Sequence, residues 1–111
     1  MTQIKFGTDG WRAIIAKEFT TDNVSRVSLA VSDFLNEKNE NPTVVIGHDC
    51  RFAGELFAET AAKVLATRGV RVLLAKDFVS TPMVSLGVVN YNADIGVVIT
   101  ASHNPPSYNG Y

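Results

Sequence analysis

The segment from Thr100 to Tyr111 gathers side chains that can do chemistry. It contains two serines, a histidine, two asparagines and two prolines, and it has no lysine, aspartate or glutamate. Ser102 follows an apolar, strand-like run, so its hydroxyl could stand free at the edge of a sheet and act as a nucleophile or carry a phosphoryl group between substrates. His103 can donate a hydrogen bond or move a proton near neutral pH. Asn104 and the prolines would stiffen the turn that holds the serine.

Two other polar loops supply partners for a phosphate. They run from Gly7 to Arg12 and from Gly47 to Arg51. Arginine binds phosphate through two parallel hydrogen bonds, so Arg12 and Arg51 are natural partners of a phosphoryl group on Ser102. Glycines in the three segments would let backbone N–H groups approach an anion closely. These glycines are Gly7, Gly10 and Gly110.

The same residues also fit simpler structural roles. Serine, asparagine and proline dominate turns, so the stretch from Ser102 to Pro106 could be a plain turn. Asp49 and Arg51 could form a solvated ion pair that contributes little to stability. Arg12 could be a surface cation stacked on its neighbour Trp11.

Other catalytic sites have little support. His48, Cys50 and His103 do not have the spacing of a structural zinc site, and a fourth ligand is missing. A serine hydrolase would need a G-x-S-x-G elbow, which is absent, and adjacent residues such as Ser102 and His103 rarely point at each other. The Walker A and G-x-G-x-x-G motifs are absent as well.

Apolar residues at helical spacing predict three helices that would position these loops. Polar residues at positions 20–22 are candidate caps for the first helix, and Gly69 is well placed to end the second. Thr81 is the expected cap of the third helix, with Pro82 at its first helical position. The expected ranges are Thr20 to Asn36, Gly54 or Glu55 to Arg68, and the cap at Thr81 to about Asn90.

Three short runs rich in β-branched residues predict buried strands. They are Thr43 to Ile46, Val70 to Ala75 and Ile95 to Thr100. The stretch around Phe6 is a candidate for a further strand, and Met83 and Leu86 are expected in the core. Strands that alternate with helices and are apolar on both faces predict a three-layer α/β/α sandwich with a mixed, mostly parallel sheet of about four strands.

The composition is that of an ordinary globular sequence. The 111 residues contain 10 Lys+Arg and 11 Asp+Glu, and 46% of them are apolar. This balance argues against disorder and against a nucleic-acid binder, which would be basic. The lone Cys50 excludes an internal disulfide and suits a reducing compartment. No secretion signal stands out and no apolar run reaches the roughly 20 residues of a membrane span, so we expect a cytoplasmic protein that makes no membrane contact.

The chain stops at Tyr111, in a turn-like segment that closely follows a buried strand. A three-layer fold would need a further covering element at this point. We therefore expect residues 1–111 to be a truncated piece of a longer protein.

The three loops resemble those of a known family, the α-D-phosphohexomutases. Thr100 to Pro105 is similar to the phosphoserine loop of that family, and Phe6 to Arg12 and Tyr108 to Gly110 match it as well. Gly47 to Arg51 and Ser80 to Pro82 fall where its members have similar segments. The opening Gly-Thr-Asp-Gly-Trp-Arg most resembles the phosphoglucomutase/phosphomannomutase branch.

The resemblance implies a role in the metabolism of phosphosugars. Residues 1–111 would be most of the first of four domains, and the remaining domains of the same polypeptide would be its partners. Ser102 would pass a phosphoryl group to a hexose phosphate, giving a bisphosphorylated sugar, and would then take back the other phosphoryl group. The net result is interconversion of the 1- and 6-phosphates. Mg²⁺ would bind an oxygen of the phosphoserine, and a hexose bisphosphate would act as activator.

The family's site residues carry over one position at a time. Ser102 matches the phosphoryl carrier, Arg12 the arginine that faces it, and His103 a group for positioning or proton transfer. The positions that would bind phosphate or shape the site are Thr8, Gly10, Arg51, Asn104 and Asn109. The family has a lysine just after the point where this chain ends, and the loops of the later domains are absent. We therefore expect this piece to be inactive by itself.

Two other functions stay open. The chain could be a non-catalytic α/β module that keeps the loops as an anion-binding site. With less support, it could be a serine hydrolase. Phosphorylation of the serine in the full-length protein would separate the mutase from the first alternative, and labelling by an acyl- or phosphonyl-type serine probe would support the second.

Overall fold

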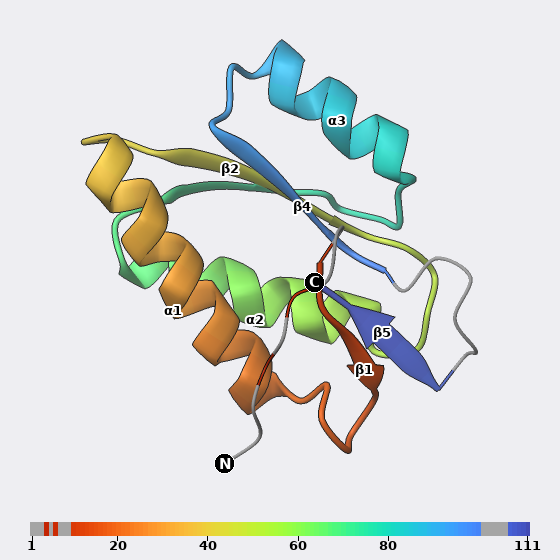
Figure 1. The fold of residues 1–111 in the computed structure, drawn as a ribbon. Coiled ribbons are helices and arrows are strands. Elements are labelled where there is room, and N and C mark those ends of the chain that lie inside the picture. Colours follow the sequence, from red (N-terminus) through yellow and green to blue (C-terminus); the bar gives the residue numbers. More distant parts are fainter. Residues whose placement is uncertain (1–3, 5, 7–9, 101–106) are drawn as a thin grey trace.

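Three parallel strands form the centre of the fold (Figure 1). The structure is a computed structural model that describes residues 4, 6, 10–100 and 107–111. The strands lie in the order β3-β2-β4, with β2 at Thr43–His48, β3 at Arg71–Leu74 and β4 at Ile95–Ile99. All three were expected from the apolar runs, with ends that differ by one or two residues.

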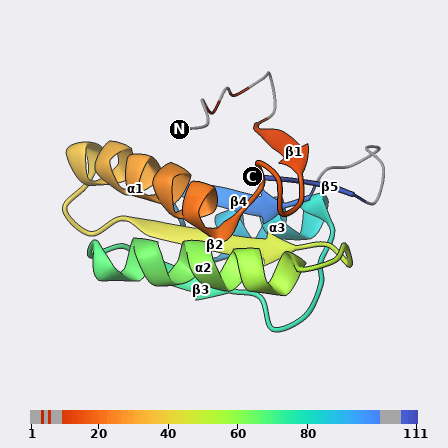
Figure 2. The same ribbon diagram turned by 90° about the horizontal axis from the view of Figure 1, so that it is seen from below.

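Helices cover both faces of this sheet. The first two, α1 (Thr21–Lys38) and α2 (Gly54–Thr67), pack side by side on one face, and α3 (Thr81–Asn90) lies on the other (Figures 1 and 2). The expected α/β/α architecture is therefore confirmed. The parallel sheet has three strands rather than about four, because the remaining described strands form a separate antiparallel ribbon.

The two faces of the sheet carry side chains of different size. On the side of α1 and α2, Val44, Ile46 and Ile99 are fully buried in the apolar core. On the side of α3, the strands present glycines. A Cβ on Gly47 would lie 2.4 Å from a methyl group of Val79, and one on Gly96 would lie 2.8 Å from a methyl group of Val88. Small residues here let α3 and the segment before it approach the sheet closely.

The helix ends follow the expected capping chemistry, with one exception. Thr20 caps α1 by accepting a hydrogen bond from the backbone N–H of Asn23 at 3.2 Å. Gly69 lies just beyond α2 with a φ of +83°, a conformation that favours glycine. The cap of α3 is Ser80 and not Thr81, because Ser80 has the extended backbone of a cap and its Oγ accepts from the N–H of Met83.

Two residues expected in the core are exposed. Met83 and Leu86 have 56% and 59% of their surface accessible. The contact of α3 with the sheet is made by Val84, Gly87 and Val88, which share one side of the helix at spacings of three and four residues. Met83 and Leu86 lie off that side, so an apolar residue on a short helix was not enough to predict burial.

A short antiparallel ribbon joins the two ends of the described chain. It consists of β1 (Arg12–Ile14) and β5 (Tyr108–Gly110). Neither strand is predicted from the sequence, in which the segment before Tyr111 has the composition of a turn. The predicted strand around Phe6 falls mostly outside the described residues, since residues 5 and 7–9 are not among them and Phe6 itself is in no strand. The position of the ribbon at the end of β4 is fixed by the N–H of Thr100, which donates to the carbonyl of Gly110 at 3.1 Å.

Aromatic packing anchors the ribbon to the core. Trp11, just before β1, is only 5% exposed, and its ring stacks on that of Phe19 with the centroids 4.6 Å apart. Phe19 in turn meets Phe57 of α2 edge to face. Trp11 is therefore a core residue that fixes the start of β1. In the part of the chain that the structure describes, no helix is both long and apolar enough to cross a membrane.

Candidate functional site

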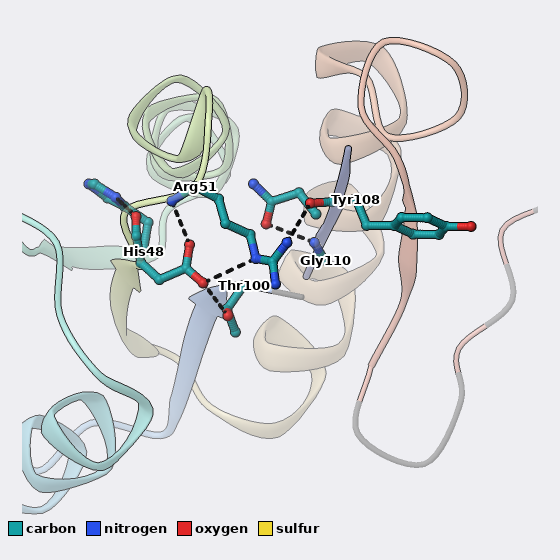
Figure 3. A network of polar contacts seen from close by, with 7 residues as sticks. His48, Arg51, Thr100, Tyr108 and Gly110 are labelled. Atoms are coloured by element: carbon teal, nitrogen blue, oxygen red, sulfur yellow. Dashed lines mark hydrogen bonds and ion pairs between the residues drawn. The ribbon is translucent and has the colours of Figure 1, made fainter. Parts of the chain in front are cut away.

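Polar side chains converge where β2 and β4 end. The carboxyl ends of parallel strands meet at one edge of a sheet, which is the usual place for a ligand site in such folds. Asp49 follows β2 and Thr100 follows β4, and the N–H of Asp49 donates to the carbonyl of Ile99 at 3.2 Å. The ribbon lies beside this edge, so β5 adds a third segment to the same place (Figure 3).

Asp49 is the centre of a polar network whose partners Thr100 and Arg51 are labelled in Figure 3. Its Oδ2 accepts a hydrogen bond from the hydroxyl of Thr100 at 2.5 Å, and its Oδ1 accepts from the backbone N–H of Arg51 at 3.0 Å. Nε of Arg51 lies 3.5 Å from Oδ2. The two charged side chains are only 27% and 13% exposed, so this is a largely buried pair and the interpretation as a solvated ion pair is wrong.

Arg51 reaches from this network to the ribbon. One of its terminal nitrogens donates to the carbonyl oxygen of Tyr108 at 3.3 Å, whereas the ring of Tyr108 points away from the network (Figure 3). The guanidinium thus joins the end of β2 to the start of β5. Its predicted part in phosphate binding stays a prediction.

Arg12 lies on the ribbon opposite the glycine that closes the junction. It is the first residue of β1, is exposed, and pairs in register with Gly110. A Cβ on Gly110 would lie 2.4 Å from the carbonyl oxygen of Thr100 and 3.0 Å from Cγ of Arg12. Three segments therefore meet at Gly110 with no room for a side chain, and this close packing brings Arg12 next to the end of β4.

Gly10 also has a steric reason to be glycine. Its φ is +144°, and a Cβ there would lie 2.4 Å from the carbonyl oxygen of Tyr111. The sequence had suggested that this glycine allows an anion to approach. The close neighbour in the structure is instead the backbone of β5's end, which exchanges hydrogen bonds with Trp11 at 2.8 and 3.2 Å. A phosphate contact at Gly10 stays a prediction.

Asn109 is completely buried between the strands. Its Oδ1 accepts from the backbone N–H of Gly110 at 2.9 Å, and its Nδ2 has no hydrogen-bond partner among the described residues. A buried, unpaired amide donor costs roughly 1–3 kcal/mol. The observed contact lies within the ribbon, and the predicted role of Asn109 in binding phosphate or shaping the site stays a prediction.

Five of the predicted site residues lie outside the described part of the chain. They are Gly7, Thr8, Ser102, His103 and Asn104. The structure does describe the residues that flank the last three, since Thr100 precedes them and Ser107 follows them. Both flanks are tied: Thr100 to Asp49, and Ser107 through its carbonyl oxygen, which accepts from the N–H of Ile15 at 2.7 Å.

The sequence did not identify Thr100 or the carboxylate of Asp49 as residues of the site. The available signal was their position, because each is among the first polar residues after an apolar strand. His48 does not belong to this network. The residue is 8% exposed, and its Nδ1 donates to the carbonyl oxygen of Asp49 at 2.8 Å. That contact assigns the ring proton to Nδ1, since a carbonyl oxygen can only accept.

The described residues do not supply a metal site. Across residues 10–100 and 107–111, no group of three or more histidine, cysteine, aspartate or glutamate side chains is placed to hold an ion. The carboxylate of Asp49 is occupied by Thr100 and Arg51. The Mg²⁺ that the resemblance implies does not fit this set by itself, and it would need ligands from elsewhere.

A partly buried tyrosine ties the end of the ribbon to α1. The hydroxyl of Tyr111 lies 3.0 Å from Oγ of Ser28, which is itself fully buried. Burial raises the pKa of Tyr111, and the hydrogen bond with Ser28 partly opposes that rise. The neutral phenol is therefore the form that the folded chain accommodates.

Comparison with known proteins gives this arrangement a family. The model for the phosphoglucomutase/phosphomannomutase α/β/α domain I matches residues 3–111. The chain belongs to this family. The phosphohexomutase resemblance of its loops is thereby confirmed, together with the α/β/α fold.

Relatives in the phosphoglucomutase/phosphomannomutase family share the whole length of this chain. A phosphoglucomutase from Staphylococcus epidermidis is 39% identical over 115 residues, and one from Staphylococcus haemolyticus is 34% identical over 112 residues. Each alignment covers 98% of this chain and 20% of the relative. The chain therefore spans about a fifth of the length of these curated relatives.

Solved structures show the same fold. The crystal structure of a candidate phosphomannomutase from Thermus thermophilus superposes with a TM-score of 0.93 at 43% identity. The match covers 96% of this chain and 24% of that one. A phosphoglucomutase/phosphomannomutase family protein from Burkholderia thailandensis superposes with a TM-score of 0.74 at 27% identity, over 91% of this chain and 23% of that one.

Proposed function

We propose that this chain is the phosphoserine-bearing domain of a phosphohexomutase. In this proposal Ser102 carries the phosphoryl group of an intramolecular phosphotransferase that interconverts hexose 1-phosphate and hexose 6-phosphate. The observation that supports it most is the convergence of β1, β4 and β5 at one edge of the sheet. Thr100 and Ser107, which flank the Ser102 segment, are both tied at that edge, and Arg12 lies on the adjoining strand.

The proposed reaction is a pair of phosphoryl transfers. In the first, the bond between phosphorus and Oγ of Ser102 breaks, a bond from phosphorus to a free hydroxyl of the hexose phosphate forms, and the hydroxyl proton leaves to a base. The bisphosphorylated sugar then turns over and returns its other phosphoryl group to Ser102. Catalysis of such a transfer depends on positioning and on stabilisation of the charge on the phosphoryl oxygens.

Residues of this chain would supply part of that stabilisation. Arg12 would pair with the phosphoryl oxygens, because a guanidinium matches phosphate geometry. His103 would position the reacting group or move its proton. The positions that we expect to bind phosphate or shape the site around it are Thr8, Gly10, Arg51, Asn104 and Asn109. Mg²⁺, with ligands outside the described residues, would neutralise charge when bound.

The complete site would need more than these 111 residues. The proposal includes further domains of the same polypeptide that contribute sugar recognition and metal ligands, so the present chain would be inactive by itself. It also includes a hexose bisphosphate activator, which would load the phosphoryl group onto an unphosphorylated Ser102. We place the activity in the cytoplasm, where an exposed Cys50 would stay reduced.

Replacement of the serine tests the proposal. In the full-length protein, Ser102→Ala should lower kcat by more than about a thousandfold in the presence of hexose bisphosphate, because no phosphoryl carrier remains. Ser107→Ala is the matched control, since Ser107 is exposed and its observed contact uses only its backbone carbonyl.

Undiminished turnover in Ser102→Ala would overturn the phosphoserine mechanism. Phosphate binding without any serine phosphorylation would instead favour the non-catalytic anion-binding module. Labelling of the native serine by an acyl- or phosphonyl-type probe would favour a hydrolase.

A further inference from the structure

One charged pair contacts residues on both sides of the segment that contains Ser102. On the near side, Asp49 accepts a hydrogen bond from the hydroxyl of Thr100. On the far side, Arg51 donates to the carbonyl oxygen of Tyr108. Asp49 and Arg51 are joined to each other through the ion pair and through the backbone N–H of Arg51 (Figure 3).

We propose that Asp49 and Arg51 are positioning residues that hold Thr100 and Tyr108 in a fixed relation. We call these four residues the stem clamp. Through its two stems, the clamp sets where the intervening segment presents Ser102 to substrate. The inference rests on the proposed function, and it assigns the pair a role distinct from direct contact with the phosphoryl group.

The clamp is built on a rigid turn. The N–H of Gly54 donates to the carbonyl of Arg51 at 3.1 Å, and a Cβ on Gly54 would lie 3.1 Å from the carbonyl oxygen of Asp49. The turn is thus closed against the first residue of α2. A support of this kind can transmit position, because its own geometry is fixed by backbone contacts on both sides.

The burial of the pair gives it a preferred geometry. The side chains of Arg51 and Asp49 are 13% and 27% exposed, and Nε of Arg51 is shielded from solvent. A shielded charge that loses its partner is strongly unfavourable, so both charges are held where the other can reach them. Backbone contacts such as the N–H of Thr100 to the carbonyl of Gly110 fix the strand ends, and the clamp adds the side-chain orientation.

A positioning role predicts a specific kinetic pattern. Small displacements of a reacting group reduce the rate of chemistry by large factors. Loss of the bond between Thr100 and Asp49 should therefore lower kcat while KM for the hexose phosphate changes by less than about twofold, since neither of these two side chains is proposed to contact the substrate. It should also speed hydrogen exchange in the peptide between the stems, because a freed stem opens more often.

The test uses paired variants of the full-length protein. Thr100→Val removes the hydroxyl that donates to Asp49 at nearly constant volume, and Thr100→Ser retains a hydroxyl. We expect Thr100→Val to lower kcat by roughly ten- to a hundredfold, the size of a hydrogen bond to a charged group. Thr100→Ser should recover most of that loss. Thr60→Val is the matched control, because the hydroxyl of Thr60 bonds only within α2 to the carbonyl of Leu56 in the described contacts.

A double-variant cycle guards against simple unfolding. Asp49→Asn should lower kcat to a similar degree, and adding Thr100→Val to it should cause less than the multiplied loss, because both substitutions weaken the same hydrogen bond. Thermal melts of each variant identify any that has unfolded. If Thr100→Val is unfolded, the comparison of Thr100→Ser with Asp49→Asn takes its place. Independent, multiplicative effects of the two substitutions would overturn the clamp.

Hydrogen exchange separates the clamp from the proposed function. We expect exchange in the peptide spanning residues 100–108 to speed by about tenfold or more in Thr100→Val and to stay near the native rate in Thr100→Ser. This readout does not need mutase activity. Unchanged exchange and unchanged kcat in Thr100→Val would overturn the clamp, even if Ser102→Ala is inactive. Full activity of Ser102→Ala would overturn the proposed function, and it would not alter the exchange result.

Discussion

At each end of the parallel sheet an aspartate side chain links β2 to β4, but the two links have different roles. At the amino end, Asp94 precedes β4, and its Oδ2 accepts from the N–H of Thr43 at the start of β2 at 2.7 Å. At the carboxyl end, Asp49 follows β2 and accepts from the hydroxyl of Thr100 after β4. Each aspartate therefore ties β2 to β4, one at either end.

The surroundings of the two aspartates differ. Asp94 is exposed, and its other oxygen accepts from the side-chain amide of Asn39, which ends α1. Asp49 is more buried and is paired with an arginine that reaches the ribbon. The hydrogen bonds of Asp94 hold the start of β2 and the end of α1 in place, so they contribute to stability. The link at Asp49 reaches both flanks of the Ser102 segment, which is where the proposed chemistry needs precision.

The largest effect on stability should come from filling the crowded junction at the carboxyl end. Gly110→Ala would place a Cβ against the carbonyl oxygens of Thr100 and Trp11, so we expect the free energy of unfolding to fall by about 3 kcal/mol in urea titrations. Gly69→Ala is the control, because no atom lies within 4 Å of a Cβ there and only the positive φ opposes it, at about 1 kcal/mol. Equal losses in the two variants would contradict a crowded junction.

Neutralising the two aspartates should affect different properties: kcat for Asp49 and the free energy of unfolding for Asp94. Asp49→Asn in the full-length protein should lower kcat by about tenfold or more, since Arg51 then loses its ion-pair partner. Asp94→Asn should leave kcat within about twofold and lower the free energy of unfolding by about 1 kcal/mol. Steady-state kinetics and urea unfolding measure the two quantities. An equal fall in kcat for both would remove the distinction between the two ends.

The smallest effect concerns the tie between the ribbon and α1. Tyr111→Phe should cost about 1 kcal/mol at pH 8, because Ser28 loses its partner. Burial raises the pKa of Tyr111 in the folded state, so its stabilising effect is complete below the ordinary pKa and is lost as the pH rises through the folded value. Native stability should therefore fall more steeply above pH 10 than that of Tyr111→Phe, as urea unfolding across this range would measure. A parallel decline in both would contradict a buried phenol.

Much of the fold could be predicted because its signals are local. Apolar periodicity located α1 and α2, and β-branched runs located β2, β3 and β4, within one or two residues. The ribbon could not be predicted, because each of its strands has three residues and depends on a partner almost a hundred positions away. Asn109 and Gly110 also favour turns locally, and only pairing with β1 makes this segment a strand.

In the candidate site, too, some features could be predicted from the sequence and others could not. Arg51 and Gly10 are candidates by residue type and Asn109 by the family resemblance, but neither source indicates which contacts these residues make. The bond between Asp49 and Thr100 joins residues 51 positions apart, so no local pattern could reveal it. Met83 was expected in the core because it is apolar, and it is exposed because α3 meets the sheet along a different side.

The most direct test of the account follows the phosphate on Ser102 during a single turnover. Purified full-length protein would be mixed with an unactivated hexose monophosphate, and the peptide containing Ser102 would be weighed by mass spectrometry at successive times. We expect one phosphate on Ser102 at the start, its loss as an equal amount of hexose bisphosphate forms, and its return as the bisphosphate is converted to the product monophosphate. Turnover of the sugar phosphate with no phosphate on Ser102 at any time would contradict it.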